Sequence, residues 1–201
     1  MTDYKEIVQG SQEWLEARLG FCTASRVSDA LAGKDTETRK NYLWQLVAER
    51  LTKTPQAGFA PNAAMIRGTE QEPIARAAYE AHTGVFVDQV GFVPHPTIKW
   101  LGASPDGLVG DDGLVEIKNP NTATHLQYRK AGKVPTKYKN QMMLQLACTG
   151  RKWCDFVSFD SRLPVSKMLF IVRFEPEQKE IDEMLDKIQV FLSEVEAECD
   201  D

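Results

Sequence analysis

The chain has 201 residues, 42% of them hydrophobic, so it can bury the core of one ordinary domain, and we expect a single domain over residues 1–201. Nothing resembles a signal peptide or the roughly 20 apolar residues that cross a bilayer, so we expect a soluble, cytoplasmic protein without a membrane partner. The net charge of −5 first argues against nucleic acid. Residues 175–201, however, hold eleven acidic and two basic side chains, which leaves 22 basic and 18 acidic ones before them. The acidity therefore belongs to one segment and does not exclude nucleic acid.

The first third of the chain is predicted to be mostly helical. Ser11 can cap a short helix that Gly20 ends, the second helix ends at Gly33, and Gly84 follows the fourth. The third shows apolar residues at helical spacing. Glu70 and Glu72 stand in the middle of the fourth. The expected helices span residues 11–19, 23–33, 37–52 and 63–82.

From Val85 onward, short β-rich runs predict the centre of the fold. Pro135 suits the first turn of a helix that ends at Cys148, and Pro176 opens a final helix with one apolar side. The acidic outer side of that helix either repels DNA or is simply solvated, and we favour solvation. The fold class expected is α/β, with a central mixed β-sheet flanked by helices. The predicted strands span residues 85–93, 99–103, 113–118, 153–159 and 167–174.

The cysteines have two interpretations. They show no Cys-x-x-Cys spacing, so we expect reduced, structural thiols. Ligation of an iron–sulfur cluster is the alternative, and it is disfavoured because cluster ligands usually come in closely spaced groups. The four residues are Cys22, Cys148, Cys154 and Cys199.

The segment from Gly102 to Pro120 carries the strongest chemical signal. Asp106 lies in a Pro-Asp-Gly turn, and ten residues later Glu116 and Lys118 flank one residue of a predicted strand. Alternate strand residues share a face, so Glu116 and Lys118 point the same way. A hairpin through residues 110–113 can bring Asp106 beside them. We therefore expect two carboxylates and one ammonium group in a small volume.

This combination suits metal-assisted hydrolysis of phosphodiesters. Two adjacent carboxylates repel each other unless a cation lies between them, and hard oxygen ligands favour magnesium or manganese. The Ile117 carbonyl is a further candidate ligand, and the Lys118 ammonium can orient the attacking water or neutralise charge on the phosphate. An Asp…Glu-x-Lys pattern also occurs by chance in charged strands. The Ser-Pro-Asp-Gly turn and the glutamine-bearing helix downstream favour the nuclease interpretation.

Several further motifs stand in order along the chain. They are Trp14 with Ala17-Arg18-Leu19-Gly20, Thr23-Ala24-Ser25, Arg67-Gly68-Thr69-Glu70-Gln71-Glu72, Ser104-Pro105-Asp106-Gly107, Glu116-Ile117-Lys118, and Tyr138 with Gln141. With these motifs the chain resembles the PD-(D/E)xK nucleases, and within them the lambda exonuclease-like (YqaJ-type) phage recombination exonucleases. The resemblance implies a PD-(D/E)xK core, 5′-to-3′ digestion of one strand of duplex DNA, and a 3′ single-stranded product.

The resemblance also implies roles for individual residues. Asp106 and Glu116 would bind two magnesium ions, for which manganese can substitute, and Lys118 would activate the water. Glu72 matches a helix carboxylate that supports the second ion. The alternative is that Glu72 is an ordinary solvent-facing acid, as we expect Glu70, two positions earlier on another face, to be. Gln141 matches a glutamine that closes the active site from a helix. Gln145, one turn later, we assign to the helix surface.

A second group of residues matches positions that contact DNA. Arg18, Ser25 and Ser104 match the residues that bind the 5′-terminal phosphate, which guanidinium and hydroxyl groups suit chemically. Tyr138 lies one turn before Gln141. Met65 stands where the family has an apolar wedge, although a lone methionine on a helix is more often core. A surface role for Arg18 and a simple helix cap for Ser25 are the alternatives.

One position departs from the family pattern. Thr124 stands eight residues after Glu116, where a well-known member of the family has an arginine. His125, Arg129 or another basic residue is a candidate to substitute. A basic run from Arg129 to Lys139 can follow DNA phosphates or form a solvated surface, which is the commoner case.

The resemblance extends to partners. It implies a ring-shaped homotrimer around duplex DNA, cooperation with a single-strand annealing protein, and a phage or prophage gene expressed in a bacterial host. Two other functions remain open. One is a restriction or repair endonuclease on the same core, because a metal site alone does not require a DNA end. The other is a DNA-binding or scaffold protein without activity, which the intact acids and lysine disfavour.

Overall fold

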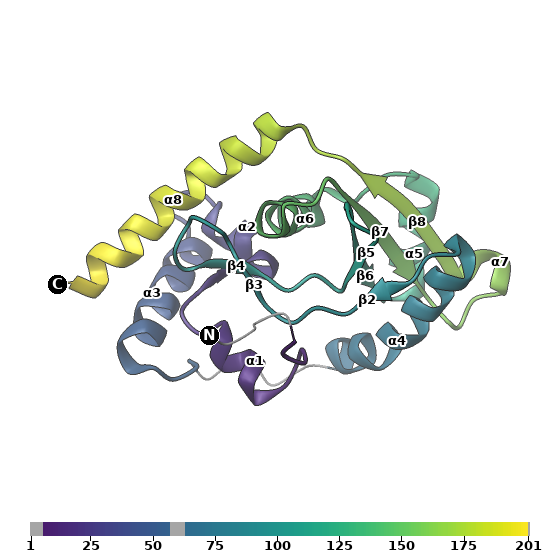
Figure 1. Ribbon diagram of the computed structural model, residues 1–201, viewed down its shortest axis with the longest axis horizontal. Helices are drawn as coiled ribbons and strands as arrows, with labels where there is room; N and C mark the ends of the chain where they lie inside the picture. The colour runs from purple at the N-terminus through teal and green to yellow at the C-terminus, as the bar shows by residue number, and fades with distance from the viewer. Residues whose placement is uncertain (1–5, 57–62, 201) are drawn as a thin grey trace.

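The computed structural model describes residues 6–56 and 63–200, and the side chains from residue 66 onward in the second range. Helices flank two β-sheets (Figure 1). No helix in these two ranges is both long and apolar enough to cross a membrane. A 3₁₀ turn, Ala24–Arg26, precedes α2. The helices are α1 (Gln12–Ala17), α2 (Val27–Ala30), α3 (Glu37–Thr52), α4 (Ala63–Thr83), α5 (Thr122–Ala131), α6 (Thr136–Thr149), α7 (Val165–Met168) and α8 (Gln178–Asp200).

The larger sheet is mixed and has the strand order β2-β5-β6-β7-β8. β6 and β7 are parallel, and the other neighbours are antiparallel. A smaller sheet has the order β1-β4-β3. These sheets confirm the predicted α/β fold class, with a mixed sheet flanked by helices. The strands are β1 (Cys22–Thr23), β2 (Val87–Asp88), β3 (Val93–Pro94), β4 (Leu101–Ala103), β5 (Gly107–Val109), β6 (Gly113–Lys118), β7 (Trp153–Phe159) and β8 (Leu169–Phe174).

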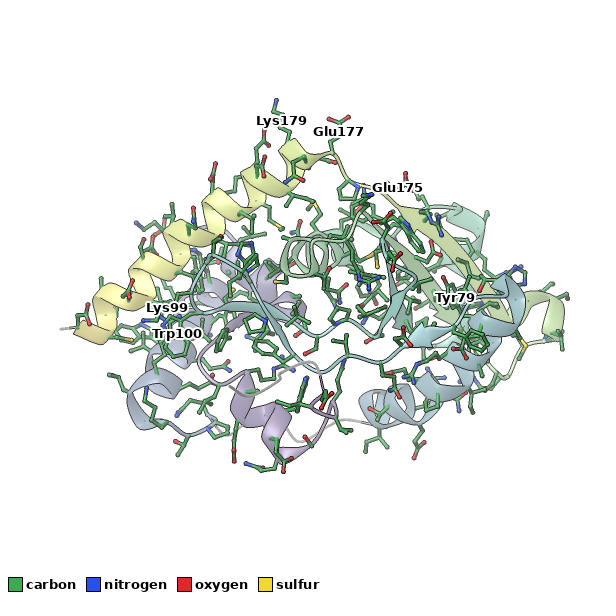
Figure 2. All side chains as sticks on the ribbon, in the orientation of Figure 1. Tyr79, Lys99, Trp100, Glu175, Glu177 and Lys179 are labelled. Carbon is green, nitrogen blue, oxygen red and sulfur yellow. The ribbon has the colours of Figure 1, made fainter. Side chains whose placement is uncertain are left out.

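Alternation along β6 separates two hydrophobic cores. Leu114 joins the larger core with α6 and α8, whereas Val115 and Ile117 join a smaller core with α4. Tyr79 anchors α4 to the sheet, because its buried hydroxyl donates to Asp155 Oδ2 of β7 at 2.8 Å (Figure 2). Both faces of β6 are therefore covered, and the side that faces α6 also receives Glu116.

The final helix packs as the apolar spacing predicts. α8 lies along α3 on the outside of the molecule (Figure 1). Tyr42 stacks on Phe191, and Arg39 donates to Glu194 at 2.7 Å. At the other end of α8, Glu177 and Lys179 point away from the body of the molecule (Figure 2). The helix thus combines an apolar seam with a solvated acidic face.

Three details differ from the sequence-based expectation. The run 85–93 does not form one strand, because β2 and β3 belong to different sheets. The expected strand at 167–174 begins as α7 and becomes extended only from Leu169. Helix α5 was not predicted, although Asn121 caps it by accepting from the Thr124 N–H at 2.9 Å. A run of Thr, Ala and His has no clear apolar period, so the cap is the informative signal.

Candidate active site

The β5–β6 hairpin positions the two central carboxylates. Gly107 pairs with Val115, and one step further along this register sets Asp106 opposite Glu116. A Cβ atom at Gly107 would lie 2.1 Å from Val87 of β2, so only glycine lets β5 fit here. β5 begins after Asp106, and the Ile117 N–H therefore donates to the carboxylate Oδ2 at 2.6 Å instead of to a strand. The turn and the hairpin together hold Asp106 beside the end of β6.

Glu116 is held from three sides. Its side chain is fully buried, and Lys118 forms an ion pair with Oε1. From α6, Gln141 donates to Oε1 at 2.6 Å and Gln145 donates to Oε2 at 2.6 Å. The predicted proximity of Glu116, Lys118 and Gln141 is thus present in the structure. Their catalytic roles stay a prediction.

Gln145 is the residue that the sequence reading placed wrongly. It is fully buried rather than at the helix surface, and it contacts Glu116 as directly as Gln141 does. The two glutamines are four residues apart and share one face of α6. That spacing is the signal that could have identified the second glutamine. Its Oε1 atom accepts no hydrogen bond within the described ranges.

The electrostatics of the cluster favour a bound cation. Burial raises the pKa of Asp106 well above its usual range, and the negative charge of Glu116 raises this pKa further. Burial by itself lowers the pKa of Lys118, but Glu116 and Asp106 outweigh that effect and raise it. The ammonium therefore stays charged at neutral pH. One ammonium group faces two carboxylates, of which Glu116 is fully buried, and when both are ionised the excess of negative charge suits a metal ion.

The candidate metal ligands come from few side chains. Asp106 and Glu116 supply carboxylate oxygens, and a strand residue carries its N–H and C=O on the same edge, so the Ile117 carbonyl also faces Asp106. No group of three or more His, Cys, Asp or Glu side chains within residues 6–56 and 66–200 is arranged to hold a metal by itself. A magnesium ion here would therefore need the backbone carbonyl and water as well, as is usual for this ion.

Helix α4 brings Glu72 near the cluster of Asp106, Glu116 and Lys118, but Glu72 pairs with a residue of its own helix. The charge of Glu72 contributes to the raised pKa of Asp106, while its Oε1 accepts from Arg76 at 2.8 Å. Glu70 is exposed. Arg67 fastens α4 to the end of β6 by donating to the carbonyl oxygens of Asn119 and Pro120, at 2.7 and 2.6 Å. The role of Glu72 at a second ion stays a prediction.

The residues predicted to bind a 5′ phosphate are linked through Trp14. The indole Nε1 of Trp14 donates to Ser104 Oγ at 2.9 Å, and the Arg18 guanidinium lies 4.1 Å from the Trp14 ring centroid. Arg18 donates to Thr23 Oγ1 at 3.2 Å and lies 3.4 Å from Ser25 Oγ. Burial lowers the pKa of Arg18, and no acidic side chain in the described ranges forms a salt bridge with it. A phosphate would supply that missing negative charge.

The other predicted DNA-contacting residues have different settings. Tyr138 stacks on Phe156 with ring centroids 5.4 Å apart, and the Lys118 ammonium lies 5.4 Å from the Tyr138 ring centroid. The Tyr138 ring is therefore next to the candidate active site. Met65 lies in α4, but its side chain falls outside the described residues. Its proposed wedge role stays a prediction.

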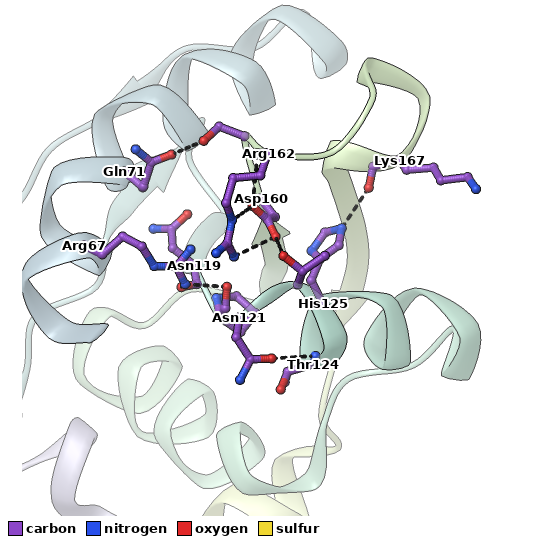
Figure 3. A network of polar contacts seen from close by, with 12 residues as sticks. Arg67, Gln71, Asn119, Asn121, Thr124, His125, Asp160, Arg162 and Lys167 are labelled. Atoms are coloured by element: carbon purple, nitrogen blue, oxygen red, sulfur yellow. Dashed lines mark hydrogen bonds and ion pairs between the residues drawn. The ribbon is translucent and has the colours of Figure 1, made fainter. Parts of the chain in front are cut away.

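The two named substitutes for an arginine at position 124 are engaged elsewhere. Thr124 itself lies in the first turn of α5. His125 is fully buried, where its ring nitrogens contact Ser158 Oγ and the Lys167 carbonyl, each at 2.8 Å (Figure 3). Arg129 donates to the Leu169 and Ser166 carbonyls. His125 therefore fastens α5 to β7 and α7, and Arg129 fastens it to α7 and β8.

The cysteines behave as structural thiols in this fold. All four are free, and Cys22, Cys148 and Cys154 are buried. Burial raises the pKa of Cys22 to about 12 and that of Cys154 well above its usual range. Neutral thiols are poor metal ligands and poor nucleophiles, which agrees with a structural role for Cys22 and Cys154.

Comparison with known proteins agrees with this arrangement. The model of the YqaJ-like viral recombinase domain matches residues 13–152. An alkaline exonuclease (LHK-Exo) from Laribacter hongkongensis is 50% identical, with a TM-score of 0.88 over 94% of this chain and 95% of that one. The structure of LHK-Exo in complex with dAMP gives the same values. A phage-related exonuclease from Haemophilus somnus 129PT shares the fold at 15% identity, with a TM-score of 0.66 over 90% of this chain and 93% of that one. Curated protein sequences give no match.

The fold and the site together define an α/β protein with a cluster of Asp, Glu and Lys side chains at the end of a central strand. The chain belongs to the YqaJ-like viral recombinase family, because the family model spans more than half of it. The predicted resemblance to the lambda exonuclease-like proteins is thereby confirmed.

Proposed function

We propose that the chain is a 5′-to-3′ exonuclease that digests one strand of duplex DNA and leaves 3′ single-stranded overhangs for phage-type recombination by strand annealing. Family membership and the 50% identity to an alkaline exonuclease support a phage-type DNA exonuclease. The direction of digestion and the requirement for a DNA end belong to the proposal. The residues around Trp14 and Asp106 support both.

The observation that carries the proposal is the position of Ser104. This residue stands two positions before Asp106 and accepts a hydrogen bond from Trp14, whose ring lies against Arg18. One short segment therefore links the candidate phosphate site to the candidate metal site. A 5′ phosphate held by Arg18, Ser25 and Ser104 would place the first phosphodiester bonds of that strand near Asp106 and Glu116. This arrangement favours cleavage that starts at an end.

The proposed metal site uses Asp106, Glu116 and the Ile117 carbonyl, with Glu72 toward a second ion. Magnesium, or manganese in its place, would supply Lewis-acid activation of the scissile phosphate. Lys118 holds its proton and donates it as a hydrogen bond, so it can orient the attacking water or neutralise the developing charge. Gln141 and Gln145 keep Glu116 in one orientation. We further propose a homotrimer and a single-strand annealing partner.

A comparison of linear and closed circular substrates tests the proposal. We expect magnesium-dependent release of nucleotides from linear duplex with a 5′ phosphate, slower release from a 5′-hydroxyl duplex, and none from covalently closed circles. Label at the 5′ end should appear in solution before label at the 3′ end. Equal rates on linear and closed circular DNA would instead indicate an endonuclease of the restriction or repair type. Light scattering coupled to size exclusion tests the trimer separately.

A further inference from the structure

Another buried carboxylate, that of Asp160, holds an arginine at the end of β7. Asp160 follows the strand, and its oxygens accept from Arg162 Nε at 2.7 Å and from Arg162 Nη2 at 2.9 Å. Thr122 Oγ1 donates to the same carboxylate at 2.6 Å, and the Arg162 N–H donates to it at 3.1 Å. The guanidinium is therefore fixed in direction by a two-point contact (Figure 3).

This pair lies beside the elements that build the candidate active site. Lys118 pairs with Ser158 in the β6–β7 register, two residues before Asp160. Thr122 follows Lys118 by four positions. On the other side, Ser161 Oγ donates to Gln71 Oε1 at 2.6 Å, and Gln71 is the neighbour of Glu72 in α4. Arg162 thus stands between the α4 segment that carries Glu72 and the loop after Lys118.

The two charges of the pair differ in their access to solvent. The side chain of Asp160 is 1% exposed, whereas that of Arg162 is 52% exposed. Hydrogen bonds from Arg162, opposed by burial, lower the pKa of Asp160, so the carboxylate stays ionised at neutral pH. Of the guanidinium nitrogens of Arg162, only Nε and Nη2 donate to partners within the described ranges. The remaining N–H groups of the guanidinium fork are available to an anion.

We propose that Arg162 binds a backbone phosphate of the DNA at the mouth of the active site, and that Asp160 holds the side chain in place for this contact. The inference rests on the proposed nuclease function. Arg162 also supplies a positive charge beside the first turn of α5, because Thr122 in that turn donates to Asp160. Neither His125 nor Arg129 can do so, since both are engaged with backbone or buried groups.

The chain offers a matched control on the other end of the same strand. Arg173 of β8 donates to Asp155 Oδ1 and Oδ2 at 2.8 and 3.0 Å, and the side-chain exposures are 50% and 5%. Asp155 and Arg173 are register partners near the start of β7, whereas Asp160 follows its end. Arg162→Gln and Arg173→Gln therefore break equivalent contacts at opposite ends of the sheet. A loss that comes only from a broken ion pair should be the same in both.

The test measures binding of a 5′-phosphorylated duplex without divalent cations, across a series of salt concentrations. For Arg162→Gln we expect several-fold weaker binding and a slope of log K against log salt that is smaller by about 0.9, the value for one lost phosphate contact. Arg162→Lys should keep most of the slope but lose affinity, because it keeps charge without the fork. Arg173→Gln should match the wild type in both.

Equal slopes and affinities for Arg162→Gln and Arg173→Gln would overturn the proposal. Thermal unfolding of both variants checks that each is folded, and Arg162→Lys replaces Arg162→Gln in the comparison if that variant is not. Hydrolysis by the wild type in magnesium is measured beside the binding series. Wild-type hydrolysis with an unaltered Arg162→Gln slope rejects the Arg162 contact alone. Absence of any wild-type hydrolysis rejects the proposed nuclease function instead.

Discussion

Replacing Asp106 with asparagine distinguishes two effects of the Asp106 charge: its effect on the stability of the fold and its role in metal-dependent hydrolysis. Asparagine keeps an oxygen that can accept the Ile117 N–H, which now donates to the carboxylate at 2.6 Å. It removes a negative charge opposite the fully buried Glu116. We expect Asp106→Asn to abolish metal-dependent hydrolysis and to stabilise the fold when no metal is present.

The direction and size of this effect follow from the pKa. Burial, and then the charge of Glu116, raise the pKa of Asp106 in the folded protein. The favourable contribution of the protonated group is complete below the unfolded pKa of about 3.9 and is lost as pH rises through the higher folded value. The ionised form of Asp106 is therefore destabilising in the folded protein. Partial compensation by Lys118 limits the gain on substitution to about 1–3 kcal/mol, comparable to removal of an uncompensated buried polar group. For a chain of this length that is a rise in Tm of roughly 2–12 °C.

Thermal unfolding in EDTA at several pH values measures the effect. The difference in stability between Asp106→Asn and the wild type should grow as pH rises above the unfolded pKa of about 3.9. Glu116→Gln is the contrasting variant, because its amide N–H₂ would face donors from Gln141, Gln145 and Lys118, and we expect it to lower stability by about 1–3 kcal/mol. A lower Tm for Asp106→Asn in EDTA at pH 7, or a difference that does not grow with pH, would refute the reasoning.

Three other substitutions test the site. Lys118→Ala should lower kcat by about 10²–10⁴-fold, while duplex binding measured without metal stays close to wild type; undiminished turnover would rule out its proposed role. Arg18→Ala should reduce the preference for 5′-phosphate over 5′-hydroxyl ends by about tenfold or more, as loss of a charged hydrogen bond implies, and an unchanged ratio of kcat/KM values would count against the phosphate site. Gln145→Leu should lower both the unfolding free energy, by about 1–3 kcal/mol, and kcat, whereas wild-type kcat would show that Gln141 alone suffices to hold Glu116.

Strand alternation made the centre of the site predictable from sequence. The pattern places Glu116 and Lys118 on one face, and the structure pairs them. The turn from residue 110 to 113 correctly returns the chain so that Asp106 faces Glu116. Both features involve residues that lie close together in the sequence. Local backbone geometry determines such contacts, and local geometry can be predicted from sequence patterns.

Burial of polar side chains was not predictable in the same way. Gln145 and His125 are fully buried polar residues on helices whose sequences give no clear apolar face around them. Their partners, Glu116 and Ser158, are 29 and 33 residues away along the chain. A helix pattern shows which residues share a side but does not show which strand that side covers. Tertiary packing of α5 and α6 on β6 and β7 supplies this information.

The departure at Thr124 illustrates the limit of position-by-position comparison. A missing arginine suggests a missing contact only if no other element can bring a guanidinium to the same place. In this fold the first turn of α5 and the segment after β7 meet, so that Thr122 and Arg162, 40 positions apart, share the carboxylate of Asp160. A phosphate near that turn binds any suitably placed positive charge, whatever the position of that residue in the sequence. The comparison of Arg162 with Arg173 therefore tests whether a residue from another segment supplies a phosphate contact beside the first turn of α5.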